Sequence, residues 1–224
     1  MDRETFVRPT GEIGEAHAPA MLHDGSMRVH VIGGPGTGKT TAGRAIGIAL
    51  EVPLVELDRA IAYKAPNAAE DAPFSAWERA SWHDRLDAAT ALAHEASWVS
   101  EGIYAGWTEP LVARADVIIW LDLPGWQAAV GVVRRQWRRT RAQHGDPDRY
   151  QWLDALRLVR RAAIGYRYGR RATVDELVER DGANSASTTA AFLAPHAVRV
   201  THCRSRAAAR QAIEALTEGR RPAT

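Results

Sequence analysis

The sequence predicts an α/β fold in three layers, in which about five parallel strands form a central sheet with helices on both faces. Three observations predict it. Strand-like and helix-like segments alternate five times along the chain, without a hairpin signal between neighbouring strands. Residues 117–121 form a continuous apolar run, which is typical of a strand buried on both faces. A glycine-rich loop follows the first strand and opens the first helix.

The expected strands are short and rich in β-branched or aliphatic residues. The first runs directly into the glycine-rich loop, the second ends at Asp58, and the third ends at Glu101-Gly102. Because parallel sheets bind ligands beyond the C-terminal ends of their strands, these positions are candidates for a site. The five expected strands are residues 27–32, 54–58, 98–102, 117–121 and 198–203.

The expected helices have recognisable starts and stops. Pro53 ends a helix over residues 39–50, because the residue before a proline disfavours the helical conformation. Ser75 and Glu78 have the spacing of a capping box, which predicts a helix from there to about His94. Further helices are expected from Pro124 to about Gln143, after a break at residues 145–147 to about Arg171, and from Ser205 to about Glu218.

Length and composition are those of one soluble domain. The 224 residues are 46% hydrophobic and 25% charged, which is ordinary for a globular chain. No run reaches the roughly 18 apolar residues of a membrane span, and a secretory signal pattern is absent from the N-terminus. The single cysteine, Cys203, excludes an internal disulfide and is expected to be a buried apolar residue. These features favour a cytoplasmic protein without a membrane partner.

We expect one folded domain between two less ordered ends. Residues 1–26 show no sustained periodicity and are interpreted as a flexible extension, and residues 219–224 as a frayed tail. Residues 27–218 form the expected domain, with an arginine-rich helical lid at about residues 134–171.

The glycine-rich loop carries the most specific signal in the sequence. Residues 33–40 match the pattern G-x-x-x-x-G-K-[ST], between a predicted strand and a predicted helix. Glycines allow the backbone N–H groups to wrap a phosphate, Lys39 supplies a positive charge, and the Thr40 hydroxyl binds Mg²⁺. The loop predicts a P-loop NTPase fold that binds the triphosphate of a purine nucleotide, ATP with Mg²⁺. The expected nucleotide contacts are Gly34, Pro35, Gly36, Thr37, Gly38, Lys39, Thr40 and Thr41.

Two carboxylates at strand ends suit phosphoryl transfer. This chemistry needs an acid that holds Mg²⁺, directly or through its waters, and a base that orients or deprotonates the acceptor. Glu101 suits the metal role with Thr40, and Asp58 suits the acceptor role; each could instead cap a helix or pair with an arginine. Asp122, after the fourth strand, is expected to be structural, and Asp116, before that strand, is expected to be a turn residue.

Arginines are concentrated between residues 134 and 171, with few acids among them. The first group is Arg134, Arg135, Arg138 and Arg139, in which residues four apart share a helical face. We expect Arg134 and Arg138 to act in catalysis and Arg135 to bind nucleotide, by neutralising the transferring phosphoryl group. A solvated helical face is the alternative. The second group is Arg157, Arg160, Arg161, Arg167, Arg170 and Arg171, whose aromatic neighbours admit nucleic-acid binding, although helical apolar spacing favours a core face.

Several of these segments together resemble the adenylate-kinase-like P-loop proteins, and more narrowly the DNA topology modulation (FlaR-like) proteins. The resemblance rests on the glycine-rich loop, Asp58, the stretch from Trp98 to Tyr104, residues 115–122 and the late Arg204-Ser205-Arg206, and covers about residues 27–216. Members tend to have Asp and Asn where this chain has Glu101 and Ile103. The resemblance implies a nucleoside-monophosphate-kinase fold with a lid. It also implies an adenine site near the loop after the last strand, where Arg204 and Arg206 contact the nucleotide.

These observations favour an ATP-dependent kinase that transfers the γ-phosphoryl group to a small-molecule acceptor, such as a nucleotide or nucleoside. The alternatives are a nucleotide-dependent regulator that acts on DNA and a bare ATPase. An acceptor pocket could be lined by four tryptophans, although core packing is the simpler explanation: Trp77, Trp82, Trp107 and Trp126. The histidines are too scattered for a metal site. The acceptor and the oligomeric state are left open, and nucleic acid is a less favoured partner.

Overall fold

The central sheet has five strands, all parallel, as the sequence predicts. The computed structural model describes residues 26–64, 77–142, 156–179 and 184–218. Within them the sheet order is β2-β5-β1-β6-β7, so that β1 lies at the centre. The strands are β1 (Arg28–Gly33), β2 (Leu54–Glu56), β5 (Trp98–Gly102), β6 (Val117–Leu121) and β7 (Val200–Cys203).

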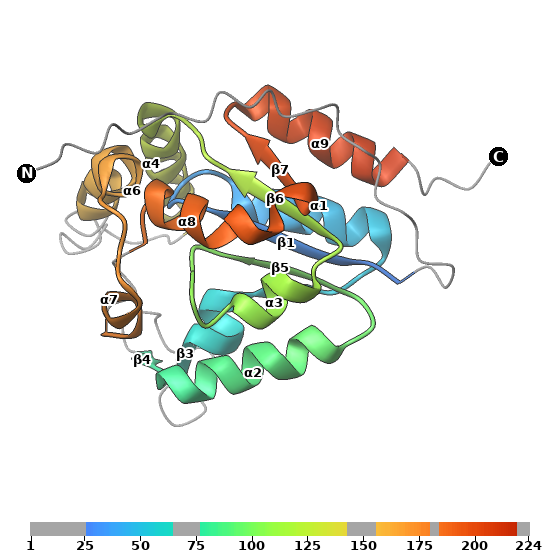
Figure 1. Ribbon diagram of the computed structural model, residues 1–224. Coiled ribbons are helices and arrows are strands. Elements are labelled where there is room, and N and C mark those ends of the chain that lie inside the picture. The colour runs from blue at the N-terminus through green and yellow to red at the C-terminus, as the bar shows by residue number, and fades with distance from the viewer. Residues whose placement is uncertain (1–25, 65–76, 143–155, 180–183, 219–224) are drawn as a thin grey trace, which may run out of the picture.

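Helices cover both faces of the sheet, which confirms the three-layer arrangement (Figure 1). On one face α1 (Lys39–Leu50) and α9 (Arg206–Glu218) pack on Val29, Val31 and the buried Cys203. On the other, α2 (Trp82–His94), α3 (Glu109–Arg114) and α8 (Ala186–Leu193) pack on a cluster that includes Trp98 and Trp120. The buried apolar runs of β1, β5 and β6 thus have a hydrophobic layer on each side.

A third group of helices lies beside the C-terminal ends of the strands. It contains α4 (Gly125–Ala142), the π-helical turn η4 (Arg161–Gly165) and α6 (Tyr166–Tyr168), and α4 contacts η4 closely. Ala128, Val132 and Ala162 form a small apolar cluster between them. The region predicted as an arginine-rich lid is therefore helical and packed together where it is described.

The segment after β2 differs from the prediction. Asp58 does not end a strand but begins the π-helical turn η1 (Asp58–Ala62), which leads to β3 (Tyr63–Lys64). The prediction of a helix that begins near Ser75 is wrong, because Glu78 lies in β4 (Glu78–Arg79), which pairs antiparallel with β3. Helix α2 instead begins after Ser81, whose side chain accepts a hydrogen bond from the Asp84 N–H. A serine six residues later therefore supplies the N-cap.

The last strand is shorter than predicted, because residues 194–199 form a 3₁₀ turn, η6 (Ala194–Arg199), before β7. The predicted extension at residues 1–26 lies outside the described residues except for Ser26, and so does the tail at residues 219–224. Asp116, expected to be a turn residue, also forms an ion pair with Arg28 at 3.1 Å. Within the described ranges, no helix combines the length and the apolar character needed to cross a membrane.

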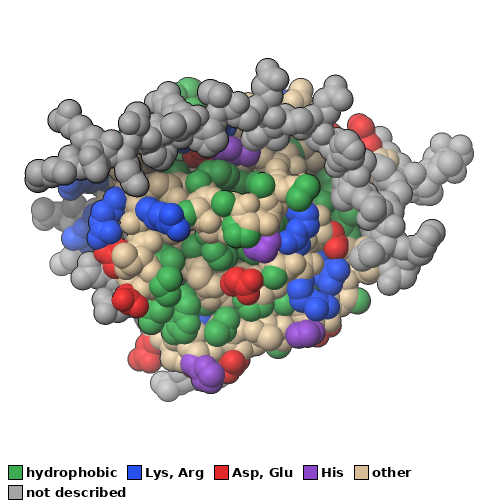
Figure 2. Space-filling model, viewed as in Figure 1, with side chains coloured by type: hydrophobic (Ala, Val, Ile, Leu, Met, Phe, Trp, Pro, Cys, Tyr) green, Lys and Arg blue, Asp and Glu red, His purple; other side chains and the backbone are tan. Residues whose placement is uncertain are grey.

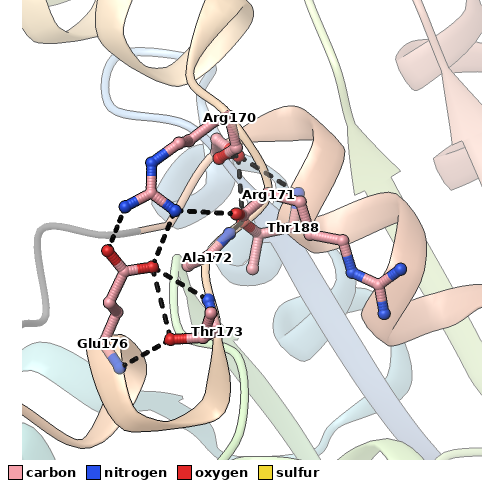
Figure 3. A network of polar contacts seen from close by, with 7 residues as sticks. Arg170, Arg171, Ala172, Thr173, Glu176 and Thr188 are labelled. Atoms are coloured by element: carbon pink, nitrogen blue, oxygen red, sulfur yellow. Dashed lines mark hydrogen bonds and ion pairs between the residues drawn. The ribbon is translucent and has the colours of Figure 1, made fainter. Parts of the chain in front are cut away.

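A polar network fixes the chain after α6, where α7 (Val174–Glu179) begins (Figure 3). The Thr173 hydroxyl accepts from the Glu176 N–H at 3.3 Å, and the Glu176 carboxylate accepts from the Thr173 N–H at 3.0 Å. This reciprocal pair is a capping box. Arg170 donates from Nη1 to Glu176 Oε2 at 2.9 Å, and the Ala172 N–H donates to Thr188 at 2.9 Å. Arg170 is thus engaged in holding α7.

Candidate nucleotide-binding site

The glycine-rich loop connects β1 to α1, with backbone angles that require glycine. Gly36 and Gly38 have φ angles of 76° and 95°, in the left-handed region that other residues rarely adopt. The Thr37 hydroxyl donates to the Gly34 carbonyl at 2.8 Å and closes the loop. The first turn of α1 follows immediately, so its N–H groups and the positive end of its dipole face the concave side of the loop.

Helix α4 contacts the loop backbone closely at Gly36 of the loop and Gly131 of the helix. A Cβ atom on Gly36 would lie 2.1 Å from the Ala128 carbonyl oxygen, and one on Gly131 would lie 2.0 Å from the Gly36 carbonyl oxygen. Only glycine permits so close an approach on both sides. Gly131 could not be identified from the sequence, because a lone glycine inside a helical pattern carries no sign of its contact.

Lys39 lies in the loop with its ammonium group donating to the Gly34 carbonyl at 3.0 Å. Burial lowers the pKa of Lys39, the nearby Glu101 and Asp58 raise it, Arg135 and Arg161 lower it, and the net pKa is below the ordinary value. Two acids and two arginines from four different elements therefore lie within electrostatic reach of this ammonium group.

Thr40 and Glu101 are brought together although 61 residues separate them in the chain. The Thr40 hydroxyl donates to Glu101 Oε1 at 2.7 Å. Strand β5 pairs directly with β1, and Glu101 stands opposite Val31, one residue before the end of its strand. Burial raises the pKa of Glu101, which is only 6% exposed; Lys39 and Thr40 oppose that shift without cancelling it. Glu101 is thus a buried carboxylate whose charge is only partly compensated.

The Thr40–Glu101 pair suits Mg²⁺. A hydroxyl and a carboxylate are hard oxygen ligands, and Mg²⁺ in nucleotide sites usually takes one or two protein groups, waters and phosphate oxygens. Among the described residues, no group of three or more His, Cys, Asp or Glu side chains is arranged to hold a metal. A site with few protein ligands, completed by a nucleotide, therefore fits this chain better than a metal site made entirely of protein.

Asp58 lies at the exposed side of the same region and is oriented by a buried tyrosine. The Tyr104 hydroxyl donates to Asp58 Oδ1 at 2.5 Å, and Tyr104 itself is 3% exposed. The Tyr104 ring packs on the ring of Trp107, with centroids 4.8 Å apart, and its carbonyl accepts from Thr108 at 2.8 Å. Asp58 is therefore an exposed carboxylate that is oriented by a buried tyrosine.

The tryptophans near this support are mainly packing residues. Trp107 is 1% exposed, and the guanidinium of the fully buried Arg85 lies 5.6 Å from the centroid of Trp82 and 5.7 Å from that of Trp107. These distances suit cation–π contacts. The core explanation therefore holds for Trp107, whereas Trp126 is 68% exposed on α4.

The arginines divide by what they contact. Arg135 on α4 and Arg161 on η4 act on the Lys39 charge beside the loop. Arg161 was not among the residues expected to bind nucleotide, because it occurs in a block of similar arginines that the sequence does not distinguish. Arg134 and Arg138 are exposed on α4, and their catalytic role stays a prediction. Arg206 donates to the Gln127 carbonyl at 3.2 Å, while Arg204 lines a cavity at the ends of β6 and β7.

Asp122, directly after β6, has a structural environment. Arg167 Nη1 lies 2.8 Å from both carboxylate oxygens, and His202 Nε2 lies 3.1 Å from Oδ2. Burial acts to raise the pKa of Asp122, but the hydrogen bonds from His202 and Arg167 outweigh it, so that the net pKa is lowered. The His202 ring also stacks on Trp120 at 3.9 Å. This cluster ties α6 to the end of the sheet.

Tyr166 connects the same helical segment to the loop. Its hydroxyl accepts from Trp120 Nε1 at 3.2 Å and lies 3.1 Å from the Thr189 hydroxyl, and its ring would lie 2.7 Å from a Cβ on Gly34. Tyr166 and Arg167 thus anchor the segment that carries Arg161, five residues earlier, beside the loop. The position of Arg161 beside the loop therefore depends on the contacts of Tyr166 and Arg167.

Comparisons with known proteins give a likeness of fold only. No family model matches the chain, and no curated protein matches it. A shikimate kinase from Bacteroides thetaiotaomicron is 15% identical with a TM-score of 0.40, over 86% of this chain and 97% of that one. A gluconokinase from Sinorhizobium meliloti 1021 is 16% identical with a TM-score of 0.39, over 86% and 92%.

A further solved structure is a shikimate kinase from Acinetobacter baumannii in complex with shikimate. It is 16% identical with a TM-score of 0.33, over 75% of this chain and 94% of that one. None of these three is named as a DNA topology modulation protein, so the narrower resemblance to that group receives no support from them. The α/β fold rests on the parallel sheet and on the loop after its central strand.

Proposed function

We propose that this protein transfers the γ-phosphoryl group of Mg-ATP to a small-molecule acceptor. The observation that carries the proposal is the contact of Thr40 with Glu101 at 2.7 Å, beside Lys39 in a glycine-rich loop. A hydroxyl and a buried, undercompensated carboxylate next to a phosphate-binding loop form the protein half of a Mg-nucleotide site. A glycine turn that bound no ligand would not need an acid at this position.

Each residue has a role that follows from its surroundings. The loop N–H groups and Lys39 would bind the β- and γ-phosphates, and Thr40 and Glu101 would hold Mg²⁺, which neutralises phosphate charge. Asp58, exposed and oriented by Tyr104, would accept the proton of the attacking acceptor hydroxyl. Arg135 and Arg161 lie near Lys39, where negative charge accumulates on the transferred group, and would stabilise it there.

The direct test compares two substitutions in one site. Lys39→Ala removes the charge on the phosphates and is expected to abolish ATP binding in calorimetry. Asp58→Asn is expected to leave ATP binding within about twofold and to lower transfer by about 100-fold, as general-base removal does. Arg210→Ala, an exposed site on α9, is the control. Unchanged transfer in Asp58→Asn would remove Asp58 from the mechanism.

The acceptor can be identified as a compound that stabilises the folded protein. A thermal-shift screen of nucleotides, nucleosides and small metabolites with a non-hydrolysable ATP analogue and Mg²⁺ should reveal a compound that raises the midpoint by mass action. The same compound should stabilise Asp58→Asn less than it stabilises the wild type.

A nucleotide-dependent regulator of DNA is the second candidate, since it would use the same loop without an acceptor. On the face formed by α2, α3 and α8, basic side chains are scattered among acidic and apolar ones (Figure 2). A nucleic-acid site usually needs a basic patch or stripe. Salt-dependent DNA binding would favour this candidate, and phosphate release with neither DNA nor acceptor would indicate a bare ATPase.

A further inference from the structure

Exposed apolar side chains are concentrated in one part of the molecule, which we call the helical arm. The arm consists of α4 and of the described residues 156–179, with η4, α6 and α7. Within the described residues, the large apolar side chains exposed outside the arm are Ile48 and Val198. Those exposed on the arm are Trp126, Val130, Val133, Trp137, Leu156, Ile164, Tyr168, Val174 and Val178. Such a concentration on one part of a surface is typical of a contact with a partner.

On α4 the exposed apolar residues form one stripe. Val130, Val133 and Trp137 are three and four residues apart, so they lie on one side of the helix. The side that packs on η4 carries other residues, among them the buried Val132. Trp126 begins the same stripe, but it lines the cavity at the ends of β6 and β7, where the adenine is expected, and it is not part of the proposed surface. The stripe is thus on the side of α4 that does not pack on η4.

The rest of the arm repeats this spacing. Ile164 in η4 and Tyr168 in α6 are four residues apart, and they are 56% and 78% exposed. Val174 and Val178 in α7 are also four residues apart, and Val174 is 72% exposed. Because residues four apart lie on one side of a helical segment, each piece of the arm presents an apolar face to solvent.

The two ends of the arm carry opposite charge. Residues 125–142 contain five arginines and no acid, and Arg134 and Arg138 are exposed on α4. Residues 174–179 contain three acids and no basic residue. Glu176 is paired with Arg170, whereas Asp175 is exposed. The arm therefore has a basic apolar end at α4 and an acidic apolar end at α7.

The order of the pieces makes this surface complementary to itself. Figure 1 shows α6 between α4 and α7 on one side of the molecule, and η4 contacts both α4 and α6. A twofold axis near α6 brings α4 of one copy to α7 of the other, and it does so twice. Ile164 and Tyr168 then lie near the axis, opposite the same residues of the second copy. In such an isologous interface each surface meets its own copy, and here the basic end meets the acidic end.

We propose that the helical arm is the interface of a symmetric homodimer, in which α4 of each copy packs on α7 of the other. A different protein with an acidic amphipathic helix would match α4 but would leave the acids and valines of α7 unmatched. A second copy matches both ends at once. The proposal is independent of whether the protein is a kinase.

The first test is sedimentation velocity of the full chain over a range of micromolar concentrations, at low and at high salt. We expect a monomer–dimer equilibrium that salt weakens, because the charges at the ends of the arm are exposed. Val133→Glu places a charge in the apolar stripe and is expected to weaken the dimer by at least about tenfold. Ile48→Glu is the matched control, an exposed apolar residue on α1 outside the arm, and should leave the dimer unchanged. Thermal midpoints show that both variants are folded.

A charge exchange tests which ends meet. One variant carries Arg134→Glu and Arg138→Glu, and the other carries Asp175→Arg. Each is expected to weaken self-association by about tenfold, because the altered contact occurs twice in the dimer. In a mixed dimer, one α4–α7 contact is unaltered and the charges of the other are exchanged. The mixture should therefore associate more tightly than either variant does alone, which a catalytic role of the two arginines would not produce.

Three results overturn the proposal. A wild type that is monomeric at every concentration leaves the arm to another partner. A dimer that Val133→Glu weakens no more than Ile48→Glu does is formed by a different surface. A mixture of the charge variants that associates no more tightly than each variant alone excludes the pairing of α4 with α7.

Discussion

Glu101 and Asp122 occupy equivalent places in the fold and have opposite electrostatic surroundings. Each is a buried carboxylate within one residue of the C-terminal end of a strand that pairs with β1, with 6% and 5% of its surface exposed. Glu101 contacts a neutral hydroxyl and has other acids nearby, and burial raises its pKa. Asp122 is matched by Arg167 and His202, and its pKa is lowered.

The difference shows that the position of a carboxylate in a parallel sheet does not decide whether its role is structural or functional. Both carboxylates stand where ligands usually bind, but Asp122 already has its cation and Glu101 has only partial compensation. A carboxylate with its partners in place stabilises the fold, whereas one that lacks them is suited to a metal ion. Substitutions at and around the two carboxylates test this division of roles.

His30 also makes the stability of the protein depend on pH, so its contribution must be separated before those of the two carboxylates can be compared at acidic pH. It is fully buried on β1 with Nδ1 2.8 Å from the Ser100 hydroxyl, and burial lowers its pKa from 6.5 to about 4. Its unfolded form takes up a proton first, so stability present above pH 6.5 is lost as pH falls toward 4. The shift corresponds to about 3 kcal/mol.

The measurement is urea unfolding at several pH values for wild type and His30→Gln. The variant should lose much less stability below pH 6.5. In that background the carboxylates act in opposite directions. The lowered pKa of Asp122 contributes stability that is lost as pH falls below its ordinary value of 3.8, whereas the raised pKa of Glu101 contributes stability that is lost as pH rises above 4.5. Equal acid sensitivity of wild type and His30→Gln would refute the assignment to His30.

Glu101→Gln sharpens the comparison on the functional side. We expect Mg-dependent nucleotide turnover to fall by about 100-fold, a loss typical of groups that hold a metal or its ligands. The unfolding free energy at pH 7 should stay the same or rise, because a buried uncompensated charge is removed. Turnover and urea unfolding measure the two effects, and a variant that is active but unstable would make Glu101 the structural acid.

Much of this site follows from the sequence. The motif at residues 33–40 predicts the loop, and strand alternation predicts that Glu101 lies beside it. The partners of Asp122 were not predictable, because Arg167 is 45 residues away and His202 is 80 residues away in the chain. The position of Arg161 near Lys39 was not predictable either. It depends on the packing of η4 on α4, and nothing in the sequence distinguishes Arg161 from the other arginines of its group. Local pattern thus predicts backbone motifs, and long-range contacts decide which charges meet.

Asp122→Asn tests the structural side of the comparison. The substitution leaves Arg167 and His202 without their acceptor charge and is expected to cost about 2 kcal/mol of unfolding free energy, below the roughly 3–5 kcal/mol of a fully buried pair. The Arg167 side chain is 38% exposed, so water replaces part of the lost interaction. Mg-dependent nucleotide affinity should change by less than about threefold, since Asp122 lies outside the metal pair. Unfolding and calorimetry of one preparation give both values.

Tyr104→Phe has the smallest expected effect and concerns a third carboxylate, Asp58. Loss of the hydroxyl removes one hydrogen bond to an exposed acid, which is worth about 1 kcal/mol, or about fivefold in transfer. The midpoint of thermal unfolding should change little, because the ring remains. In the double variant with Asp58→Asn the two effects should not add. Additive effects would mean that Tyr104 acts through another group.

The Mg²⁺ dependence of nucleotide affinity tests most directly whether Glu101 holds the metal ion. A non-hydrolysable ATP analogue is titrated into wild type, Glu101→Gln and Asp122→Asn, with Mg²⁺ and with a chelator. Mg²⁺ is expected to strengthen binding to wild type and to Asp122→Asn and to have little effect on binding to Glu101→Gln. Equal strengthening by Mg²⁺ in Glu101→Gln and wild type would contradict the assignment of Glu101 to the metal.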